Sequence, residues 1–175
     1  VLVTMAGRGS RFKDIGVNKP KHEISVKGKP MFDWAMQSLH AFFDQEFVFV
    51  TQDEHNTSDF LENACDRLGI SQYQEKKLEN YTNGQAQTAL AADEFLDPDD
   101  VVAIYNIDTY IEEGQLISGK IGGDGFIPVF TAPGERWSFA KTDDNSHVTE
   151  VSEKEKISDL ATAGFYYFDC WSDLT

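Results

Sequence analysis

Two kinds of segment alternate in the first hundred residues of this chain, and they differ in their pattern of hydrophobic and polar positions. Short apolar runs occur at 1–5, 47–51 and 101–105; they are rich in β-branched or aromatic side chains, and polar residues follow each run. Such runs are typical of strands that are buried on both faces of a parallel sheet. We therefore predict three parallel strands in this part of the chain.

The segments between these strands have the periodicity of helices. Apolar residues recur every three or four positions in 30–43, which begins with a proline, and in 58–69, which begins with a serine and ends with a glycine. These residue types are common at helix boundaries. A third helix is expected over 85–96. Strands and helices in this order predict an α/β fold, with a Rossmann-like, mixed, mostly parallel sheet flanked by helices.

The pattern changes after Asp108. Strand-like segments at 125–131, 137–142, 147–151 and 161–168 are separated by turn-rich stretches, which favours an antiparallel or mixed extension of the fold. We expect a single domain over 1–175. A boundary near residue 112 would divide it into two halves, 1–112 and 113–175.

Composition narrows the class of protein. The chain has 175 residues, of which 41% are hydrophobic, so it is long enough to bury a core. A net charge of −15 argues against a nucleic-acid partner, because binding to a phosphate backbone needs a broad basic surface. No apolar stretch is long enough for a membrane helix, so we expect no membrane insertion. Cys65 and Cys170 form no disulfide framework, which suits a cytoplasmic protein.

Positive charge is concentrated around a glycine turn that follows the first predicted strand. Seven of the 15 lysines and arginines lie in 1–30, against two of the 30 acidic residues. Gly7 and Gly9 allow the backbone to approach an anion, while Ser10 and Arg11 add a hydroxyl and a guanidinium group. A third glycine in the dinucleotide-binding spacing and a P-loop Gly-Lys-Ser/Thr are both missing. The turn therefore favours a small phosphate ligand, although a structural turn with incidental cations remains an alternative.

Three further positions are candidates for chemistry. Asp108 follows a hydrophobic strand, where a carboxylate suits Mg²⁺ that bridges substrate phosphates; a turn cap is the alternative. Lys21 follows the cationic turn, but an isolated lysine is usually a surface residue. Gly84 begins a predicted helix after a polar loop that could contact a base, or it is an ordinary helix start. Ligands of open α/β sheets bind at the carboxyl ends of strands, where the glycine turn and Asp108 both lie.

Taken together and in order, these segments resemble the sugar-phosphate nucleotidylyltransferase family, an NTP-transferase domain found in glucose-1-phosphate thymidylyltransferase. The family pattern is a glycine turn ending in Arg, a Pro-Lys, a Gly-Lys-Pro helix start, a Gly-x-Ala-Gln helix start, a Gly-Asp metal turn, a Glu-Lys-Pro stretch and a Thr-Gly-Leu/Ile-Tyr strand. The corresponding stretches here are 6–11, 20–21, 28–31, 84–87, 107–108, 153–155 and 163–166.

The resemblance implies a fold of the nucleotide-diphospho-sugar transferase type and a Mg²⁺-dependent enzyme. The phosphate of a small acceptor would attack the α-phosphorus of CTP, UTP or dTTP and release pyrophosphate, in the synthesis of surface polysaccharide or glycolipid precursors. The resemblance also implies that the nucleotide binds to residues 1–112 and the acceptor to residues 113–175. The implied residues are Arg11, Lys21 and Asp108 for catalysis, with Asp108 also holding the metal; Ala6, Gly7, Gly9, Ser10 and Gly84 for the nucleotide; and Ser138, Glu153 and Lys154 for the acceptor.

The chain departs from the family pattern at four points. Arg8 replaces a glycine, Asn106-Ile107 replaces a Leu-Gly-like approach to the aspartate, and Glu155 stands where proline is usual. The second metal carboxylate of the family, expected beyond the Gly-x-Tyr strand, is absent, so the C-terminus is truncated, the metal is held differently, or the chain is a reduced relative. The oligomeric state stays open.

Two other functions remain as alternatives. A non-catalytic domain that senses nucleotides or sugar nucleotides could keep the same fold while losing metal and charge residues. A glycosyltransferase could use the same kind of sheet, but it usually needs Asp-x-Asp after the strand, and 106–108 supplies one acid.

Overall fold

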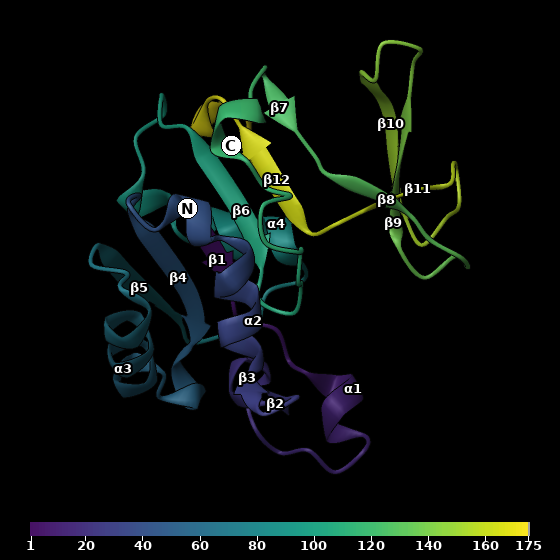
Figure 1. The fold of residues 1–175 in the computed structure, drawn as a ribbon. Helices are drawn as coiled ribbons and strands as arrows, with labels where there is room; N and C mark the ends of the chain where they lie inside the picture. The colour runs from purple at the N-terminus through teal and green to yellow at the C-terminus, as the bar shows by residue number, and fades with distance from the viewer. Residues whose placement is uncertain (175) are drawn as a thin grey trace.

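The protein consists of a central mixed sheet and a smaller sheet set to one side of it (Figure 1). The computed structural model describes residues 1–174, apart from the side chains of Arg11 and Ser118. Neighbouring strands of the central sheet follow the order β5-β4-β1-β6-β12-β7. Their bounds are β1 (Leu2–Thr4), β4 (Phe47–Gln52), β5 (Tyr73–Leu78), β6 (Val102–Asn106), β7 (Gly125–Phe126) and β12 (Phe165–Phe168).

Four neighbouring strands of this sheet, β5, β4, β1 and β6, run parallel, whereas β12 pairs antiparallel with both β6 and β7. This arrangement confirms the predicted α/β fold with a mixed, mostly parallel sheet. No helix within 1–174 is both long enough and apolar enough to cross a bilayer.

Helices pack on both faces of the central sheet. Alternate residues of a strand point to opposite faces, so Phe47 and Phe49 of β4 pack into one hydrophobic core, and Val48 and Val50 pack into another. The first core is covered by α2 (Met31–Ser38) and α3 (Ser58–Leu68), and the second by α4 (Gln85–Leu90) together with Trp171. The remaining helical segments are α1 (Ser10–Lys13) and the 3₁₀ turns Lys21–Glu23, His40–Phe42, Asp53–His55, Asp93–Phe95, Ser118–Lys120 and Trp171–Asp173.

Two predicted helices end earlier than their periodicity suggested. The segment 30–43 is helical from Met31 to Ser38 and then continues as a 3₁₀ turn, and 85–96 divides in the same way after Leu90. The helix predicted over 58–69 matches α3, whose C-cap is Gly69 in the left-handed conformation, with a φ of 78°. This conformation is the usual reason for glycine at a helix end.

The second sheet is antiparallel, with strands in the order β10-β9-β11-β8. Their bounds are β8 (Val129–Thr131), β9 (Ser138–Thr142), β10 (Val148–Glu153) and β11 (Leu160–Thr162). Two connections, β7 to β8 and β11 to β12, join it to the central sheet, as Figure 1 shows. A short hairpin of β2 (Ser25–Val26) and β3 (Lys29–Pro30) precedes α2.

The prediction of single strands over 125–131 and 161–168 was wrong, because each segment divides between the two sheets. The first divides at Pro128, which has no N–H to donate to a strand ladder. The second divides at Gly164, whose φ of 68° is incompatible with an extended strand. At the crossing, the N–H of Ala163 donates to the carbonyl of Pro128 at 2.9 Å. The two connections between the sheets therefore lie side by side.

Candidate active site

The glycine turn lies at the carboxyl end of β1, next to the equivalent end of β6. Thr4 is in register with Asn106 of β6, and the N–H of Met5 donates to the carbonyl of Val50 at 2.8 Å. Gly9 has a φ of 61°, and its carbonyl accepts hydrogen bonds from the N–H groups of Phe12 and Lys13, which starts α1. Because β1 and β6 are parallel neighbours, the segments that follow them meet at one edge of the sheet.

The side chain of Lys21 runs along this glycine turn. A Cβ atom at Gly7 would stand 3.6 Å from the Lys21 Nζ atom, and one at Gly9 would stand 3.5 Å from its Cγ atom. The residue begins a 3₁₀ turn after Pro20, and the next side chain, His22, is buried. This neighbour anchors the backbone of the turn while Lys21 extends toward the cavity.

Lys21 and Asp108 form an ion pair, with the Nζ atom 2.7 Å from the Oδ2 atom of the carboxylate. Both side chains remain partly accessible, at 21% for Lys21 and 39% for Asp108. The structure therefore brings two of the three predicted catalytic residues into contact, although neither their spacing nor their sequence neighbours required it. The side chain of the third, Arg11, lies outside the described part of the chain.

The turn that carries Asp108 is fixed by the start of β12. Asn106 donates its N–H to the carbonyl of Gly164 at 3.0 Å, and Thr109 donates its N–H to Asn106 at 3.1 Å. A Cβ atom at Gly164 would stand 2.5 Å from the Thr109 hydroxyl oxygen, and the φ of 68° also favours glycine there. The hydroxyl of Tyr105 also donates to the carbonyl of Thr109, at 3.0 Å. This packing holds the carboxylate at the sheet edge.

A cavity of about 360 Å³ lies over this edge. Its lining combines an ammonium, a hydroxyl, a carboxylate and a glycine backbone, which together suit a phosphorylated ligand. The lining residues are Arg8, Gly9, Ser10, Phe12, Lys21, Met31 and Asp108.

Asp108 has the features needed to hold a divalent cation that also binds a substrate. One carboxylate oxygen pairs with Lys21, and no described residue donates a hydrogen bond to the other. The described side chains contain no group of three or more His, Cys, Asp or Glu residues that could enclose a metal. These residues fit Mg²⁺ held by one carboxylate and by substrate phosphates, which is a common mode for this ion. They do not fit a closed structural metal site.

The polar loop before α4 approaches the glycine turn from the side of β4 and β5. At its end, Gly84 accepts a hydrogen bond from the Thr88 hydroxyl at 3.0 Å, and Asn83 donates its N–H to Gln87 at 2.7 Å. The Nε2 atom of Gln85 is buried and donates to no described residue. An unpaired buried donor is costly unless a ligand or water accepts from it.

Arg8 and Tyr81 form a contact at this loop that the sequence does not predict. The guanidinium carbon of Arg8 lies 4.7 Å from the ring centroid of Tyr81. In the sequence, Arg8 is one of the seven basic residues in 1–30. No local pattern relates it to Tyr81, so the pairing required the fold.

The predicted acceptor residues are close to one another but lie on the second sheet. Ser138 begins β9 and pairs in register with Glu153 at the end of β10. Lys154 follows with a φ of 60°, and its Nζ atom lies 2.7 Å from a carboxylate oxygen of Glu153. None of the three lines the cavity at Lys21 and Asp108.

Burial changes the titration of two groups near the site. Burial, followed by the neighbouring His55, lowers the pKa of His22 to about 4, so this histidine is neutral at physiological pH. Burial also raises the pKa of Tyr81 to about 12, and its hydrogen bond to Glu54 acts in the same direction. Tyr81 therefore remains a hydrogen-bond donor.

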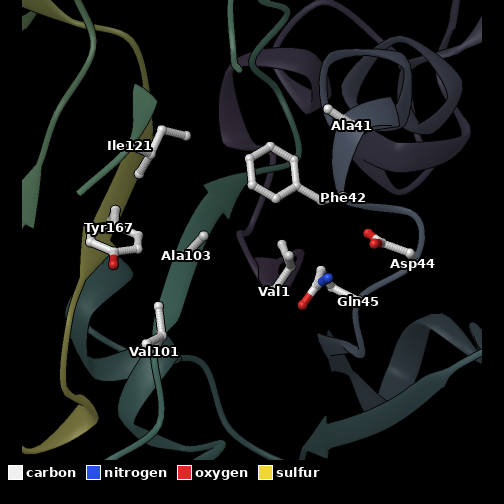
Figure 2. Close-up of a pocket in the computed structure, with 9 residues that line it drawn as sticks. All are labelled: Val1, Ala41, Phe42, Asp44, Gln45, Val101, Ala103, Ile121 and Tyr167. Atoms are coloured by element: carbon white, nitrogen blue, oxygen red, sulfur yellow. The ribbon is translucent and has the colours of Figure 1, made fainter. Parts of the chain in front are cut away.

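A second cavity, of about 330 Å³, lies at the opposite end of the central sheet. Figure 2 shows Val1, Val101 and Tyr167 around it, near the amino ends of β1 and β6. Asp44 is the one acidic side chain among its lining residues, and no lysine or arginine lines it. This cavity lacks the cations that a phosphorylated ligand needs.

Comparison with known proteins identifies relatives across the whole fold. A family model described as nucleotidyl transferase matches residues 1–171. The nucleoside-diphosphate-sugar pyrophosphorylase from Vibrio cholerae has a similar structure, with a TM-score of 0.89 and 30% identity over 99% of this chain and 75% of that one. A putative glucose-1-phosphate thymidylyltransferase from Bacillus anthracis has a TM-score of 0.77 and 20% identity, over 96% of this chain and 70% of that one.

A curated relative extends far beyond the matched region. The bifunctional protein GlmU of Methanocaldococcus jannaschii is 24% identical over 170 residues, which cover 96% of this chain and 39% of the relative. The chain thus spans about two fifths of that protein's length.

Proposed function

Because the chain belongs to the nucleotidyl transferase family, we propose that it transfers a nucleoside monophosphate from an NTP to a small phosphorylated acceptor. The observation that carries this proposal is the meeting of Lys21 and Asp108, 2.7 Å apart, in a cavity lined by the glycine turn. The similarity to a Vibrio cholerae nucleoside-diphosphate-sugar pyrophosphorylase supports a sugar phosphate as the acceptor.

In the proposed reaction, a phosphate oxygen of the acceptor forms a bond to the α-phosphorus of the NTP. The bond between that phosphorus and the oxygen leading to the β-phosphorus breaks, and its electron pair leaves with pyrophosphate. No covalent intermediate on the protein is needed, so the work of the site is positioning and charge neutralisation.

Each residue that the sequence predicts for the nucleotide has a role in this proposal. Lys21 neutralises charge on the α-phosphoryl oxygens, and Arg11 holds the triphosphate and the leaving pyrophosphate. The backbones of Gly7 and Gly9 and the hydroxyl of Ser10 contact the phosphates. The nucleoside lies along the backbone of Ala6 and Gly84, and it comes from CTP, UTP or dTTP.

Asp108 is the proposed ligand of Mg²⁺. When bound, the ion would neutralise phosphate charge and act as a Lewis acid. With the ion on Asp108, Lys21 would move from the carboxylate to the phosphates. The same nucleotide thus provides a new partner for each member of the ion pair.

Residues 113–175 form the proposed acceptor half of the domain, and 1–112 the nucleotide half. Ser138, Glu153 and Lys154 would bind the acceptor and its phosphate from the second sheet. We place the reaction in the cytoplasm, where NTPs are available, and assign the product to surface polysaccharide or glycolipid precursors.

A pyrophosphate-release assay tests this proposal. The protein is incubated with Mg²⁺, each NTP in turn, and a panel of sugar 1-phosphates, phosphocholine and other small phosphates. We expect one pyrimidine nucleotide and one acceptor to release pyrophosphate together, and the Asp108→Asn variant to release little. NTP binding without pyrophosphate release from any pair would favour a nucleotide-sensing domain instead.

A further inference from the structure

Arg8 and Tyr81 connect the two sides of the proposed nucleotide site. Arg8 lines the cavity with Lys21 and Asp108, whereas Tyr81 belongs to the loop that leads into α4. The guanidinium carbon lies 4.7 Å from the centroid of the tyrosine ring, which is a cation–π distance. The phosphate side and the base side of the site are therefore in contact through this pair.

Tyr81 is held on two further sides by residues at or just after the end of β4. Its hydroxyl donates a hydrogen bond to Glu54. With its amide oriented so that both atoms have partners, the buried Gln52 accepts from the N–H of Tyr81 at 3.2 Å and donates to the carbonyl of Leu78 at 3.1 Å. These two hydrogen bonds connect Tyr81 to the end of β4 and the turn after it.

Within the pair, Tyr81 is the anchored residue and Arg8 is the residue that it positions. Tyr81 is anchored to the central sheet by these hydrogen bonds, and its phenol keeps its proton at neutral pH. Arg8 is exposed and has no carboxylate partner among the described side chains, so the tyrosine ring is its main contact. The anchored ring therefore holds Arg8, and with it the glycine turn, against the loop.

We propose that Arg8 is a positioning residue for the nucleotide: through Tyr81 it joins the glycine turn to the loop at 79–84, so that the phosphate and base sides are assembled before the NTP binds. This inference rests on the proposed function for the identity of the ligand. It assigns Arg8 no contact with phosphate.

The test measures NTP dissociation constants by titration calorimetry and compares them with steady-state kinetics. The variants are Arg8→Ala, Arg8→Lys, Tyr81→Leu and the double variant Arg8→Ala/Tyr81→Leu. We expect each alanine or leucine single variant to raise the Kd and KM for NTP about fivefold to tenfold, with kcat and the KM for acceptor changed less than twofold. The double variant should bind NTP no more weakly than either single variant. The Kd of Arg8→Lys for NTP should fall between those of wild type and Arg8→Ala.

Two controls separate positioning from direct phosphate binding. Inorganic tripolyphosphate with Mg²⁺ has no base, so wild type and Arg8→Ala should bind it equally. Arg136 lies over Trp137 at 5.1 Å in the loop before β9, so Arg136→Ala removes a similar pair and should leave the Kd for NTP unchanged. Additive effects in the double variant, or weaker tripolyphosphate binding by Arg8→Ala, would overturn the proposal.

The outcomes also distinguish this inference from the proposed function. If wild type binds NTP but releases no pyrophosphate, the proposed reaction fails while the Kd comparison still tests the Arg8–Tyr81 pair. If Tyr81→Leu does not fold, Glu54→Gln replaces it in the comparison of single and double variants. Glu54 is exposed, and its substitution weakens the hydrogen bond that anchors Tyr81. Wild-type NTP affinity in Arg8→Ala would refute the inference whatever the activity.

Discussion

The ammonium group of Lys21 lies 2.7 Å from a carboxylate oxygen of Asp108. The two residues are far apart in the sequence, and the parallel pairing of β1 with β6 places the segments that carry them at one edge of the sheet. In the absence of ligand, each neutralises the other. An NTP with a divalent cation offers both residues stronger partners, so ligand binding should separate them.

Replacing Lys21 with alanine should lower turnover without unfolding the protein. Removing a charge that stabilises a transition state typically costs on the order of 10²-fold or more in kcat. The ion pair is partly exposed, and such pairs contribute at most about 1 kcal/mol to stability. Pyrophosphate release and a thermal melt measure the two effects. Near-normal turnover in a folded variant would remove Lys21 from the mechanism.

The substitution Asp108→Asn should change the dependence of turnover on Mg²⁺. The amide loses the negative charge that attracts the cation, so we expect a large loss of kcat and a higher Mg²⁺ concentration for half-maximal rate. Glu113→Gln, which neutralises an exposed carboxylate outside the cavity lining, is the matched control and should behave as wild type. Equal Mg²⁺ curves for Asp108→Asn and wild type would contradict the assignment.

Gly164 should be intolerant of alanine because its neighbours leave no room for a Cβ atom. The contact of 2.5 Å with Thr109 adds to the strain of a φ of 68°, so we expect Gly164→Ala to lower the free energy of unfolding by roughly 2 to 5 kcal/mol. Gly134 has a φ of 82° but no atom within 4 Å of its Cβ position, so Gly134→Ala should cost only about 1 to 2 kcal/mol. Urea denaturation of both variants measures the difference, and equal losses would show that packing against Thr109 is unimportant.

The protein should become less stable as the pH is lowered from the pKa of His22 in the unfolded chain to its pKa in the folded protein. The unfolded histidine takes up a proton near its ordinary pKa of 6.5, whereas burial lowers the folded pKa to about 4. Protonation between these values favours the unfolded state, so stability is complete above pH 6.5 and decreases toward pH 4, by on the order of 3 kcal/mol.

Urea denaturation at pH 7 and pH 5 tests this dependence. The variant His22→Gln does not titrate and should lose less stability over that interval than wild type. The neighbouring His55 also has a pKa lowered by burial, so a smaller slope is expected to persist in the variant. Identical slopes for the two proteins would exclude His22 as the source.

The strands with uniform hydrophobicity were predictable from sequence, and those with mixed composition were not. β4 is buried at all six positions and reads as an apolar run. β5 contains the sequence YQEKKL and lies at the edge of the sheet, where polar side chains reach solvent, so its composition resembles a loop. The division of 125–131 and 161–168 between two sheets depends on a tertiary crossing that no local pattern records.

The candidate site also combines features that the sequence predicts with features that it does not. The glycine turn and Asp108 could be proposed from residue type and order because strand ends of a parallel sheet converge, whereas Lys21 was proposed from the family resemblance. The contact of Arg8 with Tyr81 and the packing of Gly164 against Thr109 depend on side chains from distant segments. Hydrophobic periodicity carries no information about such pairs.

The most direct test of the central claim is to determine which phosphorus of the nucleotide is attacked. The active NTP and acceptor pair is incubated with Mg²⁺, and the products are identified by mass spectrometry and ³¹P NMR. We predict one equivalent of pyrophosphate and a product in which the nucleoside monophosphate is joined to the intact acceptor phosphate through a diphosphate bond. Release of inorganic phosphate, or of a nucleoside diphosphate, would show attack at another position and would contradict the account.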